Sequence, residues 1–130
     1  MSEHDHQVSL FSWRDHIGVR EFPELEWMFA IPNGGHRKIS VATRLKREGV
    51  KAGVLDVLIP IPRGGYIGMW IEMKFGKNKL TKEQAAFMEK MRDFGYHCAV
   101  AYVVDDAVKE VRNYMQMEKH EAGRENKKHD

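Results

Sequence analysis

Apolar residues in the first third of the chain recur every three or four positions, which is the spacing of one face of a helix. They predict a first helix that ends before Pro23 and a second helix that Gly49 closes, with a turn-rich loop at residues 31–35 between them. The residues with this spacing are Leu10, Trp13 and Ile17 in the first helix and Ile39, Ala42 and Leu45 in the second. We therefore expect two helices before any strand.

The middle of the chain contains short apolar runs that are typical of strands. Residues 54–59 form the first run, which ends at Pro60, and Gly64-Gly65 turn the chain into a second run at residues 66–75. Because only a short connection separates the two runs, we expect them to form an antiparallel hairpin.

Helix and strand alternate in the last third of the chain. Residues 81–84 (Thr-Lys-Glu-Gln) have the pattern of a capping box, and they open a helix that Gly95 ends. Residues 96–104 are nearly all apolar, so we expect a strand in the centre of the sheet, followed by a helix at about residues 105–117. The element order is ααββαβα, which predicts an α/β fold with a small mixed sheet flanked by helices.

Length and composition narrow the class of protein. The 130 residues suit one compact domain, and 42% apolar with 31% charged residues is typical of a globular protein. We expect this domain at residues 1–117 and a disordered polar tail at residues 118–130. No stretch approaches the roughly 18 consecutive apolar residues of a membrane helix. The polar first residues and the single Cys98 favour a cytoplasmic location without disulfides.

The total charge of +2 conceals a strongly basic middle segment. Residues 36–82 carry eleven basic and three acidic side chains, a balance of +8, whereas residues 1–35 have a balance of −4 and residues 83–130 a balance of −2. Such a basic cluster favours a polyanion as partner. The charge pattern alone leaves open a second reading, a solvated lysine-rich face without a ligand.

Three charged residues, Asp56, Glu72 and Lys74, lie in the predicted strands where apolar residues would be expected. Side chains alternate along a strand, so Glu72 and Lys74 point to the same face, and strand pairing would bring Asp56 opposite Glu72. Two carboxylates beside an ammonium group can hold Mg²⁺ and support phosphodiester hydrolysis. The alternative is an ordinary salt bridge between Glu72 and Lys74 at a solvent-facing strand edge.

Several short motifs around these residues carry a resemblance to a known family. They are residues 49–56 (Gly-Val-Lys-Ala-Gly-Val-Leu-Asp), residues 71–74 (Ile-Glu-Met-Lys), Leu80-Thr81 with Gln84, Gly95-Tyr96, and an upstream loop at residues 31–35 with Arg37. In this order, over about residues 24–115, they resemble the VRR-NUC (virus-type replication-repair nuclease) family of PD-(D/E)xK nucleases. One departure is Leu55, at the position where the family usually has proline before the aspartate.

The resemblance implies a PD-(D/E)xK restriction-endonuclease-like core and assigns roles to individual residues. Asp56 and Glu72 would be metal ligands together with the main-chain carbonyl of Met73, and the metal would be Mg²⁺ or Mn²⁺. Lys74 would be the catalytic lysine. Gln84 matches a family glutamine near the site, and its other possible role is that of the capping-box partner. The expected catalytic residues are thus Asp56, Glu72, Lys74 and Gln84.

The resemblance also implies a function. We expect a metal-dependent DNA endonuclease that is selective for DNA structure, such as branched DNA or Holliday junctions, in phage or bacterial replication and repair. A non-catalytic nucleic-acid-binding module of the same fold and a restriction-type endonuclease are the alternatives. Glu3 is the best match to a glutamate that family members often have in their first helix. The basic residues expected to contact DNA are Arg37, Lys38, Arg44, Lys46, Arg47, Lys51, Lys77 and Lys79.

A homodimer is the expected working unit. A two-fold pair would place two sites at a fixed separation, which suits a branched DNA with two symmetry-related strands. Phe22, Trp27 and Phe29 are candidates for the apolar core of the interface, and burial within one subunit is their alternative fate.

Overall fold

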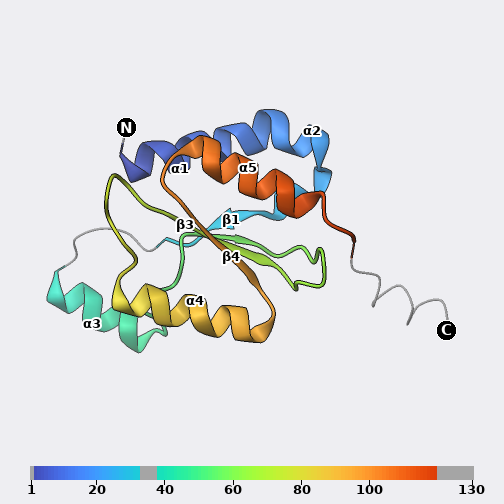
Figure 1. The fold of residues 1–130 in the computed structure, drawn as a ribbon. Helices are drawn as coiled ribbons and strands as arrows, with labels where there is room; N and C mark the ends of the chain where they lie inside the picture. The colour runs from blue at the N-terminus through green and yellow to red at the C-terminus, as the bar shows by residue number, and fades with distance from the viewer. Residues whose placement is uncertain (1, 33–37, 120–130) are drawn as a thin grey trace.

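A four-stranded sheet lies between two layers of helices in the computed structural model, which describes residues 2–32 and 38–119 (Figure 1). Helices α1 (Glu3–Trp13) and α5 (Val104–Met115) pack against each other and cover one face of the sheet. Helix α4 (Lys82–Phe94) covers the other face. The predicted α/β class with a small mixed sheet is therefore confirmed.

The sheet has the strand order β1-β2-β3-β4. Its strands are β1 (Phe29–Ala30), β2 (Val57–Ile59), β3 (Met69–Met73) and β4 (His97–Ala101). β2 pairs antiparallel with both β1 and β3, so the predicted hairpin is confirmed, whereas β3 and β4 run parallel. β1 was not predicted from the sequence, because it is only two residues long.

The predicted central position of the last strand is wrong. Within the described part of the chain, β4 pairs with β3 alone and forms an edge of the sheet. Its apolar sequence has another cause, because α4 and α5 cover its two faces. Ala99 and Ala101 belong to the core on the α1 and α5 side, and Cys98 and Val100 to the cluster beneath α4.

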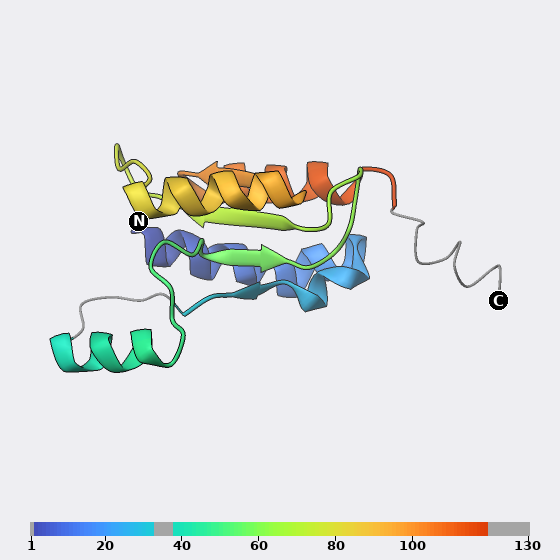
Figure 2. The same ribbon diagram turned by 90° about the horizontal axis from the view of Figure 1, so that it is seen from below.

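The first predicted helix is interrupted but ends where expected. α1 continues through a π-helical turn, Arg14–Gly18, into the short helix α2 (Val19–Glu21), and a 3-10 helix then spans Pro23–Trp27. The second predicted helix is α3 (Ile39–Arg47). None of its side chains is buried, and α3 stands apart from the layered core at the end of the molecule that also holds the start of α1 (Figures 1 and 2).

Both ends of the described chain are attached to the core. Ser2 caps α1, and the Nδ1 atom of the buried His6 accepts a hydrogen bond from the Val104 N–H at 3.1 Å. At the other end, the Glu118 carbonyl accepts a hydrogen bond from the Gly64 N–H at 2.7 Å. The predicted tail lies outside the described residues from residue 120 onward.

No helix among the described residues is long and apolar enough to cross a lipid bilayer.

Candidate active site

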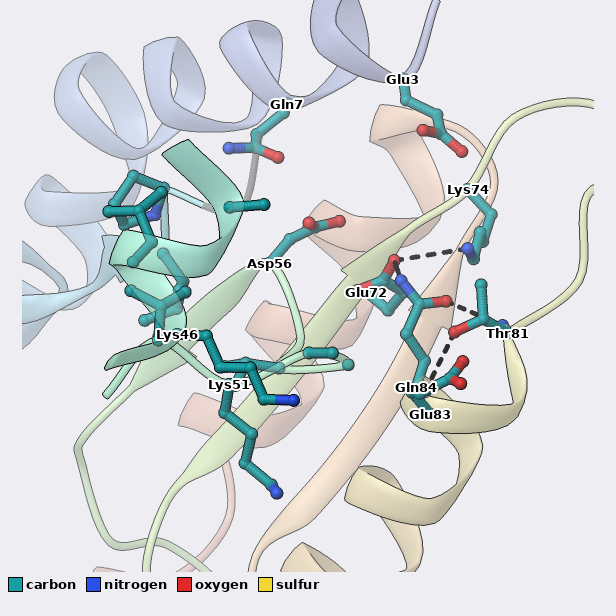
Figure 3. Close-up of a pocket in the computed structure, with 18 of the residues that line it drawn as sticks. Glu3, Gln7, Lys46, Lys51, Asp56, Glu72, Lys74, Thr81, Glu83 and Gln84 are labelled. Atoms are coloured by element: carbon teal, nitrogen blue, oxygen red, sulfur yellow. Dashed lines mark hydrogen bonds and ion pairs between the residues drawn. The ribbon is translucent and has the colours of Figure 1, made fainter. Parts of the chain in front are cut away.

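A cleft of about 1470 Å³ opens where the carboxyl end of β3 meets the residues before β2 (Figure 3). One wall is the first turn of α1, and the opposite wall is the amino end of α4. Residues of α3 and of the loop at residues 49–54 complete the lining. Segments that are far apart in the sequence thus converge on one hollow, and the predicted catalytic residues lie at its base.

Asp56 reaches the cleft from the residue before β2. The register that pairs Val57 with Ile71 places Asp56 opposite Glu72, as predicted from the sequence. Its Oδ2 atom accepts a hydrogen bond from the Met73 N–H at 2.9 Å. Burial raises the pKa of the Asp56 carboxyl above its ordinary value, and the Met73 N–H opposes this shift.

Glu72 lies on β3 and is only 2% exposed. Its Oε2 atom accepts a hydrogen bond from Gln84 Nε2 at 2.8 Å, and Lys74 Nζ lies 3.6 Å from the same oxygen. Burial and then the negative charge of Asp56 raise the pKa of Glu72 to about 8. In the absence of a cation, Glu72 therefore retains a proton far above the usual pH range of a carboxyl.

Lys74 follows β3 and is as buried as its neighbours in the strand. Its backbone N–H donates to the Ala101 carbonyl at 2.8 Å, so β4 supports its position. A solvent-facing salt bridge between Glu72 and Lys74, the alternative raised from the sequence, does not describe this pair because both side chains are buried. A buried ammonium group beside a carboxylate pair is typical of a functional site.

Gln84 belongs to the predicted capping box and also lies beside Glu72, so the structure contains both of the placements that were considered for it. In the capping box, its N–H donates to Thr81 Oγ1 at 3.1 Å and its Oε1 accepts from the Thr81 N–H at 3.0 Å. The remaining part of the amide, Nε2, points to Glu72 (Figure 3). The start of α4 therefore fixes the orientation of the Glu72 carboxylate.

The donor set fits one hard divalent cation. Among the buried side-chain atoms of the described chain, Glu72 Oε1 is one of three without a hydrogen-bond partner, and Asp56 lies opposite it. A carboxylate oxygen that is buried and unpaired is costly unless a cation or a proton satisfies it. Within the described ranges, no group of three or more His, Cys, Asp or Glu side chains forms a metal cluster, so the candidate ligands are this carboxylate pair.

Met73 contributes its backbone to the site rather than its side chain. The side chain is buried in the core on the α1 and α5 side of the sheet, while the N–H holds Asp56. Metal ligation by the Met73 carbonyl stays a prediction.

Two residues of α1, Glu3 and Gln7, also face the cleft (Figure 3). They are four residues apart and therefore lie on the same face of the helix. The charge of Glu3 contributes to the raised pKa of Asp56. Gln7 is a lining residue that was not predicted from the sequence, although its spacing of four residues from Glu3 was the available signal.

The predicted DNA-binding residues are spread around the cleft rather than gathered in it. Lys46 of α3 and Lys51 line the cleft (Figure 3). Lys77 and Lys79 are exposed on the loop that follows Lys74. The other described members are exposed on α3 or at its start, and they are Lys38, Arg44 and Arg47. Arg37 lies outside the described residues.

Comparisons with known proteins agree with this geometry. The sequence matches the VRR-NUC domain over residues 3–105. A solved structure described as a VRR_NUC domain protein is 28% identical to the chain, covers 92% of each of the two chains, and superposes with a TM-score of 0.78. None of the curated proteins compared with the chain matches it.

Proposed function

Because the chain belongs to the VRR-NUC family of PD-(D/E)xK nucleases, we propose that it is a DNA endonuclease that requires Mg²⁺ or Mn²⁺. The observation that carries the proposal is the arrangement of Asp56, Glu72 and Lys74 at the base of an open cleft. Hydrolysis of a phosphodiester bond requires positive charge at the phosphate and an activated water, and this group of side chains suits both needs.

Each side chain has a distinct part in this reaction. Asp56 and Glu72 would hold the cation, which supplies positive charge to the phosphate and lowers the pKa of an attacking water. Lys74 places an ammonium group beside them, where it stabilises the negative charge that develops on the phosphate oxygens in the transition state. Gln84 binds Glu72 Oε2 and so leaves Oε1 directed to a ligand.

The finer features of the proposal concern the substrate and its setting. We propose selectivity for DNA structure, such as branched DNA or junctions, in phage or bacterial replication and repair in the host cytoplasm. A restriction-type enzyme is less favoured because the described chain is accounted for by the nuclease core and leaves little for base readout. A non-catalytic binding module is less favoured because all three catalytic positions are occupied.

Cleavage of labelled DNA tests the proposal directly. We expect the wild-type protein to cut DNA with Mg²⁺ or Mn²⁺ and to lose this activity in EDTA. Asp56→Asn, Glu72→Gln and Lys74→Met should each lower kcat/KM by about 10²-fold or more, because each removes a charge that serves the transition state. Products should be internal cuts in circular as well as linear DNA.

Matched substitutions on the exposed face of α4 provide the controls. Asp93→Asn, Glu89→Gln and Lys90→Met make the same chemical changes at exposed positions, and we expect near wild-type rates. Melting temperatures would establish that every variant is folded. Full activity in a folded Glu72→Gln protein, or equal activity with and without EDTA, would contradict the proposal.

We also propose that the active unit is a homodimer. Trp27, at the end of the 3-10 helix before β1, is 66% exposed, and Phe29 of β1 is exposed as well. Phe22 packs partly against the core, which leaves the other two aromatic residues as interface candidates. Phe29 belongs to β1 and Trp27 comes shortly before it. β1 forms an edge of the described sheet, and an exposed edge strand readily pairs with another copy.

A further inference from the structure

Exposed apolar side chains gather immediately beside the candidate active site. Phe75 follows Lys74 and is 47% exposed, and Tyr102 and Val103 follow β4 and are exposed too, Tyr102 at 37%. The Lys74 N–H donates to the Ala101 carbonyl at 2.8 Å, so the residues that follow in the two strands are neighbours. We call this set the aromatic edge; it consists of two aromatic residues, Phe75 and Tyr102, and the neighbouring Val103. An exposed apolar patch beside a polar cleft indicates a binding surface.

The loop at residues 75–80 holds Phe75 at a fixed place relative to the catalytic residues. It starts directly after Lys74 and closes in a turn in which the Asn78 N–H donates to the Phe75 carbonyl at 3.0 Å. Its other end is Thr81, whose capping partner Gln84 binds Glu72. The backbone of Phe75 is therefore joined directly to Lys74 and, through this loop, to the hydrogen-bond partner of Glu72.

The loop at residues 75–80 is positively charged, and this favours nucleic acid over an apolar partner at the side of the aromatic edge that the loop forms. Lys77 and Lys79 follow Phe75 on the same loop, are exposed, and form no ion pair with any residue that the structure describes. On the other side, Asp105 and Asp106 lie in the first turn of α5, which starts at Val104 after the aromatic edge. The phosphate backbone is therefore expected along the loop rather than along α5. Both segments lie at the cleft end of the molecule (Figures 1 and 2).

We propose that Phe75 stacks on a base that is exposed at an interruption of the DNA duplex. In a continuous duplex each base is covered by its neighbours, and an aromatic side chain reaches a base face only by unstacking two bases, which costs free energy; at a nick, a flap or a branch point that cost is smaller. Phe75 would thus be a specificity residue that places such an interruption beside the catalytic group. The inference rests on the proposed nuclease function and gives its structure selectivity a physical origin.

Three DNA substrates of equal sequence test this inference: a continuous duplex, a nicked duplex and a four-way junction. We expect Phe75→Ala to lower kcat/KM on the nicked and branched substrates by about tenfold, the size expected for loss of one stacked base. Its rate on the continuous duplex should change less than about twofold. Phe75→Trp should retain the preference, because tryptophan stacks at least as well.

A fluorescent base analogue, 2-aminopurine, placed next to the nick reports stacking without cleavage when Ca²⁺ replaces Mg²⁺. Its emission should differ between the complexes of wild type and Phe75→Ala but not between those of wild type and Phe94→Ala, a control on an exposed phenylalanine at the far end of α4. Equal substrate preferences in wild type and Phe75→Ala would overturn the inference while Lys74-dependent cleavage continued. A change of molecular mass in Phe75→Ala would instead assign Phe75 to a contact between copies of the chain and would also overturn it. Absence of cleavage by the wild type on all substrates would overturn the nuclease proposal itself.

Discussion

The carboxyl group of Glu72 is almost completely buried. Its protonation state is therefore sensitive to the charge of the groups next to it, in particular Asp56. In the folded protein without a cation, burial and Asp56 raise its pKa from 4.5 to about 8. Between these two values the folded state keeps a proton that the unfolded chain has released. The free energy of unfolding of the metal-free protein is therefore expected to fall as the pH rises through this interval, and the raised pKa of Asp56 acts in the same direction.

Thermal unfolding in EDTA at pH values from about 5 to 8 measures this effect. The melting temperature of the wild type should fall across the series, and that of Glu72→Gln should fall less, because its amide does not titrate. Addition of Mn²⁺ at the upper end should raise the melting temperature of the wild type more than that of the variant. Parallel curves for the two proteins would show that Glu72 is not the titrating group.

Single residues show how far the sequence could be interpreted. The alternation of Glu72 and Lys74 and the position of Asp56 opposite Glu72 followed from strand geometry, and the structure has both. The burial of Leu55 could not be predicted from the sequence. The family motif has proline at this position and so carries no information about the packing of a leucine there. Leu55, the residue before Asp56, is fully buried with Trp70 beneath α4, and this packing anchors the backbone next to Asp56. The packing of Leu55 depends on α4, which lies about thirty residues further along the chain, so the sequence around Leu55 does not reveal it.

At the scale of elements, the loop that carries Asp56 is pressed against the helix that carries Gln84. A Cβ atom on Gly53 would lie 2.5 Å from the backbone carbon of Glu83, in the first turn of α4. Gly53 also has a φ of +88°, which other residues rarely adopt. This close approach sets the distance between the two sides of the cleft.

Gly53→Ala should therefore push the loop that carries Asp56 away from α4, shift Asp56 relative to Gln84 and the Glu72 that it binds, and reduce cleavage. Gly49→Ala is the matched control, because Gly49 has a φ of +97° and a Cβ atom added there would meet no atom within 4 Å. Both variants should lose about 1–2 kcal/mol of stability from the left-handed backbone, and Gly53→Ala should lose more because its added Cβ also meets the backbone of α4. Only Gly53→Ala should lose about tenfold or more in kcat/KM, since small displacements of reacting groups are costly. Titration calorimetry should also find weaker Mn²⁺ binding in that variant alone. Equal activities would show that this contact does not control the geometry of the site.

Helix α3 carries much of the predicted DNA-binding charge on a surface with no buried side chain. If Arg44 and Lys46 both contact phosphates, their double substitution by glutamine should reduce the slope of log affinity against log salt by about two. Binding measured in Ca²⁺ at several salt concentrations gives this slope. Lys90 and Lys109, which are exposed on α4 and α5, provide the control pair. A slope that does not change would exclude α3 from the interface.

The elements also show where pattern reasoning stops. Helices with a clear stripe or cap, such as α4 and α5, were predicted to within a few residues. β1 was missed because two residues cannot display a period, and its pairing with β2 depends on a distant segment. β4 was predicted to lie in the centre of the sheet because its sequence is almost entirely apolar. An edge strand whose two faces are covered by helices, as β4 is, has the same kind of sequence as a central strand.

For the whole molecule, light scattering distinguishes one chain from a pair. The dimer proposal predicts a mass near twice 15.1 kDa, and Trp27→Ser with Phe29→Ser should return it to that of one chain. Phe94→Ser, at an exposed position on α4, should leave the pair intact. An active wild-type sample with the mass of one chain at high concentration would contradict the proposal.

The route of the chain through the site also bears on its synthesis. The cleft draws on α1 near residue 3 and on α4 at residue 84, and the strand that supports Lys74 ends at Ala101. A ribosome therefore adds every catalytic side chain before the parallel strand beside them exists. We therefore expect a growing chain to remain inactive until β4 has been made and has paired with β3, because pairing between distant segments is slow.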